Sequence, residues 1–135
     1  MKYFALLFIL MAGCTNQPSD AQTAVVNAYI QEQLDVIAKN SDLSQGYKGS
    51  LLKGETVEQA KRRTKNTLDR IHYSLIALKE KPFSEQRNII VKQLKAEIDL
   101  FEKTLARHFE TRPTEPPTHV IAILEQRRKW LSVLD

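Results

Sequence analysis

The sequence predicts an all-α fold, a small bundle of about four helices. Glycine is scarce, with 4 residues in a chain of 135, and Gly46, Gly49 and Gly54 fall close together. Long stretches therefore lack both glycine and proline, the residues that most often interrupt helices. Within them apolar residues recur every three or four positions, which is the spacing of one helical face. The helices are expected at about 20–40, 56–80, 84–109 and 118–134.

The first predicted helix, 20–40, opens on a capping box. Ser19 stands at the N-cap and Gln22 three residues later, so each side chain can bond a free backbone N–H of the other residue. The segment 41–55 that follows contains three glycines. A break of this length is uncommon in a compact domain and is often functional. The apolar face of the helix consists of Val26, Tyr29, Ile30, Leu34 and Ile37.

The second predicted helix, 56–80, begins with another capping box, formed by Thr56 and Gln59. It ends before Pro82, because the residue that precedes a proline avoids the α-helical region. Its C-terminal half carries additional apolar residues, so this half is expected to be the more deeply buried. The stripe is Val57, Ala60, Thr64, Leu68, Ile71, Leu75 and Leu78, to which Tyr73, Ile76 and Ala77 add a wider arc.

The third predicted helix, 84–109, is expected to be capped by Ser84 and to form an antiparallel hairpin with the second. A proline-rich connection, 111–117, then leads to the last helix, 118–134, with Thr118 or Thr114 as its cap. Residues 20–135 are therefore expected to form a single helical domain. The apolar faces are Ile90, Val91, Leu94, Ile98, Phe101, Leu105 and Phe109 in the third helix, and Val120, Ile123, Leu124, Leu131 and Leu134, with Trp130 beside them, in the last.

The first fourteen residues have the features of an export signal. Lys2 is followed by an apolar run at 3–10, and small residues precede Cys14. The run is well short of the ~20 residues that span a bilayer as a helix. The ending Ala12-Gly13-Cys14 resembles the lipobox of bacterial lipoproteins, in which the cysteine is acylated and becomes the mature N-terminus. This resemblance implies a cleaved signal peptide at 1–13, a palmitate-type lipid on Cys14 and a short tether at 14–19. An ordinary signal peptide with a chance cysteine and an uncleaved anchor are the alternatives.

The short tether restricts where the domain can lie. The six residues from Cys14 to the first helix reach roughly 20 Å when extended, so the domain is expected close to the membrane. Thr15, rather than aspartate, follows the cysteine. This resembles the pattern of enterobacterial lipoproteins sorted to the outer membrane, and implies a lipid-anchored protein that faces the periplasm.

With 1 cysteine in the chain, an intramolecular disulfide and a cysteine-based zinc site are excluded.

The sequence shows no pattern that indicates an enzyme, a cofactor or a metal site. The three histidines, His72, His108 and His119, lack the i, i+3 or i+4 spacing that aims ligands together from a helix. Segment 49–56 resembles a phosphate-binding loop, but Glu55 stands where the lysine belongs. A net charge of +4, of which Lys2 lies in the signal, is far from that of a nucleic-acid-binding protein. Neither nucleic acid nor a small-molecule substrate is therefore expected.

Two basic clusters occur, Lys61-Arg62-Arg63-Lys65 and Arg127-Arg128-Lys129. Both are expected to be solvated helix surface, because Glu58 lies four residues before Arg62 and Glu125 four before Lys129, the favourable order for helical ion pairs. Contact with acidic lipid or with an acidic partner is the alternative.

These observations favour a non-enzymatic lipoprotein that binds or helps to assemble another envelope protein in or near the same membrane. In architecture alone the chain resembles the helical pilotins, lipoproteins that escort secretin subunits. A helical groove that accepts a partner's amphipathic helix is the expected mechanism. An immunity or entry-exclusion lipoprotein, which neutralises an incoming toxin or transfer apparatus, is the alternative. Partner contacts are predicted at Tyr47, Leu51, Leu52 and Trp130.

Overall fold

The computed structural model describes residues 17–41 and 51–135. Over these residues it contains four helices and no strand, so the all-α prediction is confirmed. Each helix lies within two residues of its predicted ends. They are α2 (Asp20–Ser41), α3 (Val57–Lys79), α4 (Phe83–Thr111) and α5 (Thr118–Leu134).

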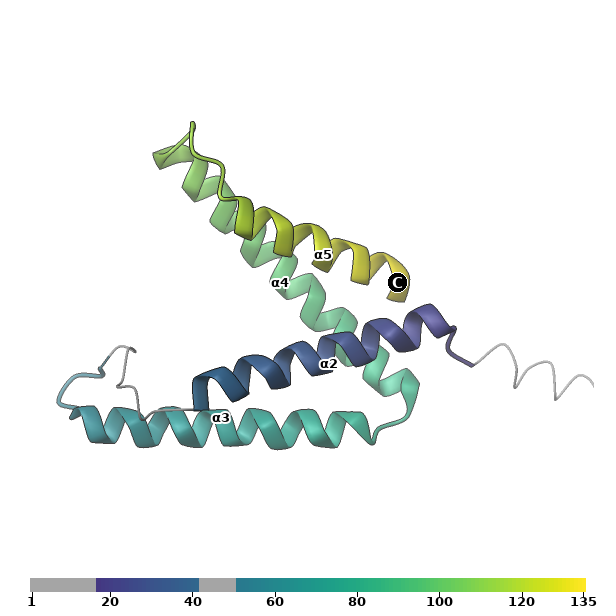
Figure 1. The fold of residues 1–135 in the computed structure, drawn as a ribbon, viewed down its shortest axis with the longest axis horizontal. Helices are drawn as coiled ribbons and strands as arrows, with labels where there is room; N and C mark the ends of the chain where they lie inside the picture. The colour runs from purple at the N-terminus through teal and green to yellow at the C-terminus, as the bar shows by residue number, and fades with distance from the viewer. Residues whose placement is uncertain (1–16, 42–50) are drawn as a thin grey trace, which may run out of the picture.

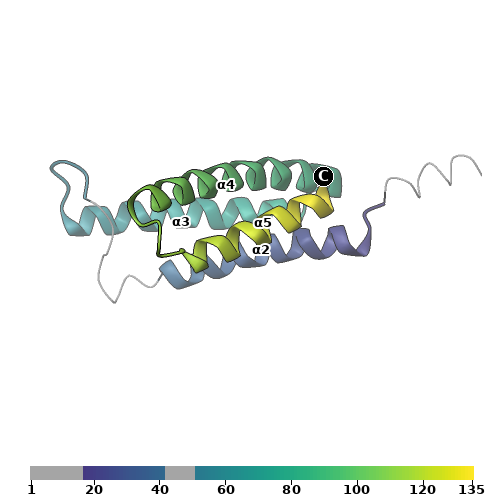
Figure 2. The same cartoon turned by 90° about the horizontal axis from the view of Figure 1, so that it is seen from above.

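The helices are arranged as two antiparallel hairpins that cross each other (Figure 1). Helix α2 packs along α3, and α4 packs along α5, while α2 also contacts α4 and α5. From the turn at 80–82, α4 diverges from α3, and the two have little contact beyond it. Figure 2 shows α4 and α2 at opposite sides of the molecule, with α5 crossing over α2. The expected hairpin between α3 and α4 is therefore not formed, because each of them packs on a different neighbour.

The hydrophobic core lies where α2, α4 and α5 meet. Ile30, Ile90, Leu94 and Leu134 are almost completely buried there, and Leu78 is the one buried contribution of α3 to this cluster. The C-terminal half of α3 was expected to be the more deeply buried half, and it contains Leu75 and Leu78, two of the three buried residues of this helix. The wider apolar arc is not buried with them, since Tyr73 is 72% exposed, because α3 packs mainly on α2.

Both predicted capping boxes are present. At the start of α2, the Ser19 hydroxyl accepts from the backbone N–H of Gln22 at 3.1 Å, and the Gln22 side chain accepts from the backbone N–H of Ser19 at 3.2 Å. At the start of α3, the Thr56 hydroxyl accepts from the N–H of Gln59 at 3.2 Å, and Gln59 accepts from the N–H of Thr56 at 2.9 Å. These local bonds satisfy backbone donors that a helix start leaves free.

The expected caps at Ser84 and at Thr118 or Thr114 are wrong. Helices α4 and α5 begin directly after Pro82 and Pro117, and neither start has a side-chain cap. Ser84 and Thr118 consequently lie inside the first helical turn. Proline has no side-chain acceptor, so the predicted hydroxyl caps are wrong, although the predicted starts lie within one residue of those observed.

Replacing Thr56 by alanine is expected to lower the free energy of unfolding by about 1 kcal/mol, because the N–H of Gln59 loses its partner. Urea denaturation followed by circular dichroism measures the loss. Thr118→Ala is the matched control, since Thr118 makes no cap bond, and it is expected to change stability by no more than about 0.5 kcal/mol. An equal loss in both variants would show that the Thr56 cap contributes nothing specific.

The end of α3 is capped by a side chain from the next helix. Gln86 of α4 donates from Nε2 to the carbonyl oxygens of Leu78 at 3.0 Å and Lys79 at 2.9 Å. Both carbonyls belong to the last turn, where the i+4 partners within the helix are missing, and that of Leu78 also accepts from the backbone N–H of Lys81 at 3.2 Å. The bonds fix α4 against the end of α3, and so define the point from which the two helices diverge.

Candidate functional site

The space between the diverging helices α3 and α4 is floored by α2 and forms a groove, which we call the wedge groove. Its volume is about 590 Å³, within the range of about 300–1,000 Å³ that is usual for binding sites. It is closed at the α3–α4 turn by Lys81. Its lining consists of Tyr29 and Gln33 from α2, Arg70, Ile71, Ser74, Leu75 and Leu78 from α3, Lys81, and Ile89 and Gln93 from α4.

The walls of the wedge groove expose apolar side chains to solvent. Ile71 on α3 is 44% exposed, and Ile89 on α4 is 46% exposed. Tyr73 and Ile76 of α3 are also exposed, but they do not line the groove. A cluster of exposed apolar residues at a concave site is typical of a surface that another molecule covers.

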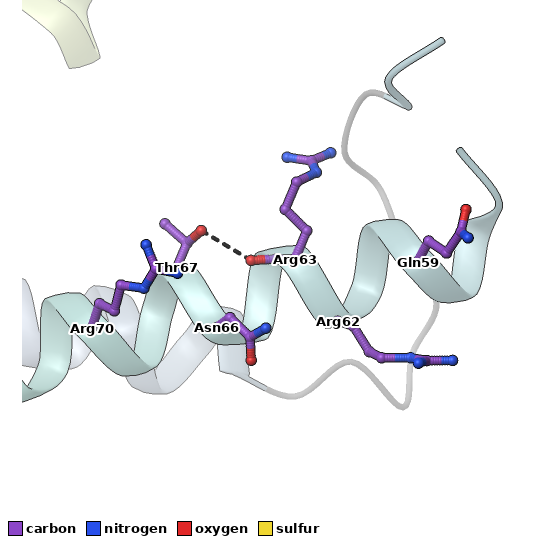
Figure 3. Close-up of a pocket in the computed structure, with 6 residues that line it drawn as sticks. All are labelled: Gln59, Arg62, Arg63, Asn66, Thr67 and Arg70. Carbon is purple, nitrogen blue, oxygen red and sulfur yellow. Dashed lines mark hydrogen bonds between the residues drawn. The ribbon is translucent and has the colours of Figure 1, made fainter. Parts of the chain in front are cut away.

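A second hollow adjoins the wedge groove along the N-terminal half of α3, and we call it the basic hollow (Figure 3). Its volume is about 400 Å³. Arg70 lines both hollows, so the two are continuous along one helix. Among the described residues, neither lining includes an aspartate or a glutamate. The basic hollow is lined by Gln59, Arg62, Arg63, Asn66, Thr67 and Arg70.

Several cations of α3 are paired with carboxylates. Arg63 donates to both carboxylate oxygens of Glu55, at 3.0 and 2.9 Å, and these bonds lower the pKa of Glu55. Lys65 bonds Asp69 at 2.9 Å. The sequence predicted an ion pair between Glu58 and Arg62. In the structure Glu58 instead pairs with Lys61, at 3.6 Å.

A buried arginine joins three helices beneath the wedge groove. The side chain of Arg127, on α5, is 6% exposed. Its two terminal nitrogens bond both carboxylate oxygens of Glu32 on α2, at 2.7 and 3.0 Å. Its Nε lies 3.0 Å from an oxygen of Glu97 on α4, although the N–H does not point along that line as in a hydrogen bond. Arg127, Glu32 and Glu97 thus form an ion cluster that links α2, α4 and α5.

Two aromatic rings complete this ion cluster. The guanidinium carbon of Arg127 lies 4.9 Å from the centre of the Trp130 ring, a cation–π contact. Trp130 also meets Tyr29 edge to face, with ring centres 6.3 Å apart. Burial raises the pKa of the Tyr29 hydroxyl and of the Glu97 carboxyl, and Arg127 partly offsets both shifts. Because Tyr29 also lines the wedge groove, the ion cluster supports the floor of that groove.

The residues predicted as sites lie in different places. Cys14 and Tyr47 fall outside the described residues. Leu51 and Leu52 are 50% and 58% exposed ahead of α3, and line neither hollow. Trp130 is half-buried and packs against the core. The structure thus does not gather Leu51, Leu52 and Trp130 around the wedge groove, and their contact role stays a prediction.

Sequence reasoning missed the burial of Arg127. The second basic cluster was expected to be solvated; Lys129 and Arg128, which lies 2.7 Å from Glu102, are exposed, whereas Arg127 is buried. A signal was present, because Arg127 follows Leu124 by three residues and precedes Leu131 by four. It therefore occupies a place in the apolar stripe of α5.

No other chemistry is evident in residues 17–41 and 51–135. No group of histidine, cysteine, aspartate and glutamate side chains there is arranged to hold a metal ion. A ring nitrogen of His108 contacts the carbonyl oxygen of Glu115, across the connection between α4 and α5. None of the helices described combines the length and the apolar character that crossing a membrane requires.

Comparison of the chain with models of protein families, with curated proteins and with solved structures finds no significant match.

Proposed function

We propose that this chain is a non-enzymatic binding protein, anchored to a membrane through a lipid on Cys14, whose wedge groove binds a helix of another envelope protein. The observation that carries the proposal is the groove itself, with Ile71 and Ile89 exposed on its two walls. An amphipathic helix laid into a groove buries its apolar face there, which is a common mode of peptide recognition.

The packing of the helices supports a groove that stays open. Helix α3 is held by α2, and α4 is held by α5 and α2, so neither wall needs the other for its own packing. Gln86 fixes the closed end through its bonds to the last carbonyls of α3. A preformed site binds its partner with a smaller ordering cost than one that must assemble.

The anchor is proposed from the signal sequence and agrees with the position of the groove. The N-terminus of α2, where the tether joins the domain, lies at the same end of the molecule as the α3–α4 turn (Figure 1). The closed end of the wedge groove is therefore the end nearer the tether. A partner embedded in or adjacent to the same membrane, at the periplasmic face of the outer membrane, lies within reach of such a site.

The binding role is tested by site-specific crosslinking in intact cells with a photoreactive residue at position 89, in wild type and in a variant carrying Ile71→Asp. We expect one dominant crosslinked partner at position 89, and its loss when Ile71 is charged, because a carboxylate in the apolar wall disfavours burial. Position 100 is the matched control, since Leu100 is 61% exposed on the same helix but does not line the groove. Equal crosslinking at positions 89 and 100 would contradict the proposal.

The anchor is tested separately by Cys14→Ser in cells fed labelled palmitate. We expect the wild-type chain to incorporate label and to fractionate with membranes, and the variant to do neither, because a serine cannot carry the thioether-linked lipid. A wild-type chain without label would rule out the lipid anchor, while leaving the groove untouched.

A further inference from the structure

We propose that the helix bound in the wedge groove is acidic, with carboxylates beside its apolar face that pair with Arg70 and Arg62. This inference rests on the proposed function, since it names the chemistry of the partner for the same groove. It concerns the charge that the two adjoining hollows present together.

The cations that line the two hollows are not balanced by carboxylates in the same linings. Of the four, Arg63 is bonded to Glu55 at the far end, and Lys81 lies 3.3 Å from Glu85 in an exposed pair. Arg62 and Arg70 form no ion pair with any residue that the structure describes. Asp69, the nearest carboxylate along the chain to Arg70, bonds Lys65 instead. Two arginines therefore remain available to an anionic partner.

The positions of these arginines set a direction for the partner. Arg70 stands where the basic hollow meets the wedge groove, and Arg62 lies two helical turns further from the closed end. Eight residues of helix correspond to about 12 Å along the axis. A helix lying along α3 would thus place apolar residues between Ile71 and Ile89, and carboxylates about two turns apart over Arg70 and Arg62. Arginine suits such contacts, because its planar group can bond a carboxylate through two nitrogens.

The same charges are less suited to an anionic membrane surface. The apolar residues beside them line a concave wedge between two helices, which a flat bilayer cannot fill. The basic hollow also lies toward the N-terminus of α3, at the end of the hairpin remote from the start of α2, where the tether joins (Figure 1). An acidic helix is therefore the partner that matches both the shape and the charge.

The test uses the full chain in detergent and two synthetic helical peptides with the same leucine face, one with glutamates and one with lysines at its charged positions. We expect the glutamate peptide to bind about tenfold more tightly in low salt. The preference should shrink as salt is raised, because exposed pairs are screened within a Debye length of about 10 Å at 0.1 M. Fluorescence anisotropy of labelled peptide measures both affinities.

The decisive variant carries Arg62→Glu and Arg70→Glu, which we expect to reverse the preference in favour of the lysine peptide. Arg107→Glu with Arg112→Glu is the matched control, because both arginines are exposed and neither lines a hollow. This control should retain the wild-type preference. An unchanged preference in the decisive variant would overturn the proposal.

Other occupants give distinguishable results. Equal binding of both peptides, abolished by Ile71→Asp, would overturn the acidic inference and leave the binding groove standing. Binding of neither peptide, together with failure of the crosslinking at position 89, would overturn both. If the decisive variant lost binding to vesicles of anionic phosphatidylglycerol while keeping its peptide preference, a lipid surface would replace the acidic helix. A concentration-dependent dimer that Ile71→Asp dissociates would identify the occupant as a second copy of this chain, which also overturns the proposal.

Discussion

Replacing Arg127 by methionine is expected to lower the free energy of unfolding by about 3–5 kcal/mol. The change removes the cation that Glu32 and Glu97 share, while the Glu97 side chain remains only 19% exposed. A carboxylate left without its partner in such a place keeps its desolvation cost and loses the attraction that offset it. Urea denaturation of the full chain at neutral pH, followed by circular dichroism, measures the loss.

The stability difference between wild type and this variant is expected to depend on pH. Burial already raises the pKa of Glu97, and Arg127 opposes that shift, so removing Arg127 raises the pKa further. A carboxyl whose pKa is higher in the folded state than in the unfolded state carries its full stability penalty above the folded pKa. This penalty is lost as the pH falls through the folded pKa toward the unfolded pKa. The difference should therefore narrow as the pH is lowered from neutral toward the ordinary pKa of a glutamate. A difference that stays constant over that window would show that lost packing, rather than charge, destabilises the variant.

A double variant provides the control for this interpretation. Adding Glu97→Leu to Arg127→Met removes both buried charges and replaces them by apolar side chains of similar volume. We expect it to recover most of the lost stability, because apolar replacements of a buried ion pair are often neutral or stabilising. If the double variant is less stable than Arg127→Met alone, Glu97 contributes by packing and not through its ion pair.

The four helices could be predicted from the sequence because the signals that form them are local. The apolar spacing and the capping boxes at Ser19 and Thr56 each depend on residues within a few positions of one another, and the structure contains both boxes. The caps of α4 and α5 were wrongly predicted, although the predicted starts lie within one residue of those observed. There a proline begins the helix, and the hydroxyl residues that follow it serve no capping role.

The pairing of the helices could not be predicted in the same way. A short connection brings the end of α3 close to the start of α4, but it does not fix the angle between the two helices. That angle depends on which faces bury the most apolar surface, and here α4 packs on α5. Ile71 illustrates the consequence, because its place in the stripe of α3 predicts a core residue, whereas the divergence of α4 leaves it on the wall of the wedge groove.

The ion cluster could be predicted from the sequence only in part. Arg127 and Glu97 both stand at apolar-stripe positions, Glu97 three residues after Leu94 and four before Phe101. Opposite charges in the stripes of two different helices are an indication of a buried ion pair, since an unpaired charge rarely stays in a core. The sequence does not specify which helices meet, however, so the third member, Glu32, emerges only from the packing of α2 against α5.

Replacing Leu94 by alanine is expected to lower the free energy of unfolding by about 2–5 kcal/mol, through lost burial and the cavity left behind. Leu94 is 0% exposed and belongs to the cluster in which α2, α4 and α5 meet. Thermal or urea denaturation of the full chain measures the loss. Because Leu94 does not line the wedge groove, the variant should still bind the glutamate peptide with wild-type affinity wherever it remains folded.

Leu100→Ala is the matched control, because it makes the same chemical change on the same helix at a residue that is 61% exposed. It is expected to change the free energy of unfolding by no more than about 0.5 kcal/mol. Similar losses in the two variants would mean that α4 is buried on a different face, and would remove the basis for placing Ile89 on the groove wall. A large loss confined to Leu94→Ala would fix which face of α4 points to the core, and leave the face that carries Ile89 and Gln93 open to a partner.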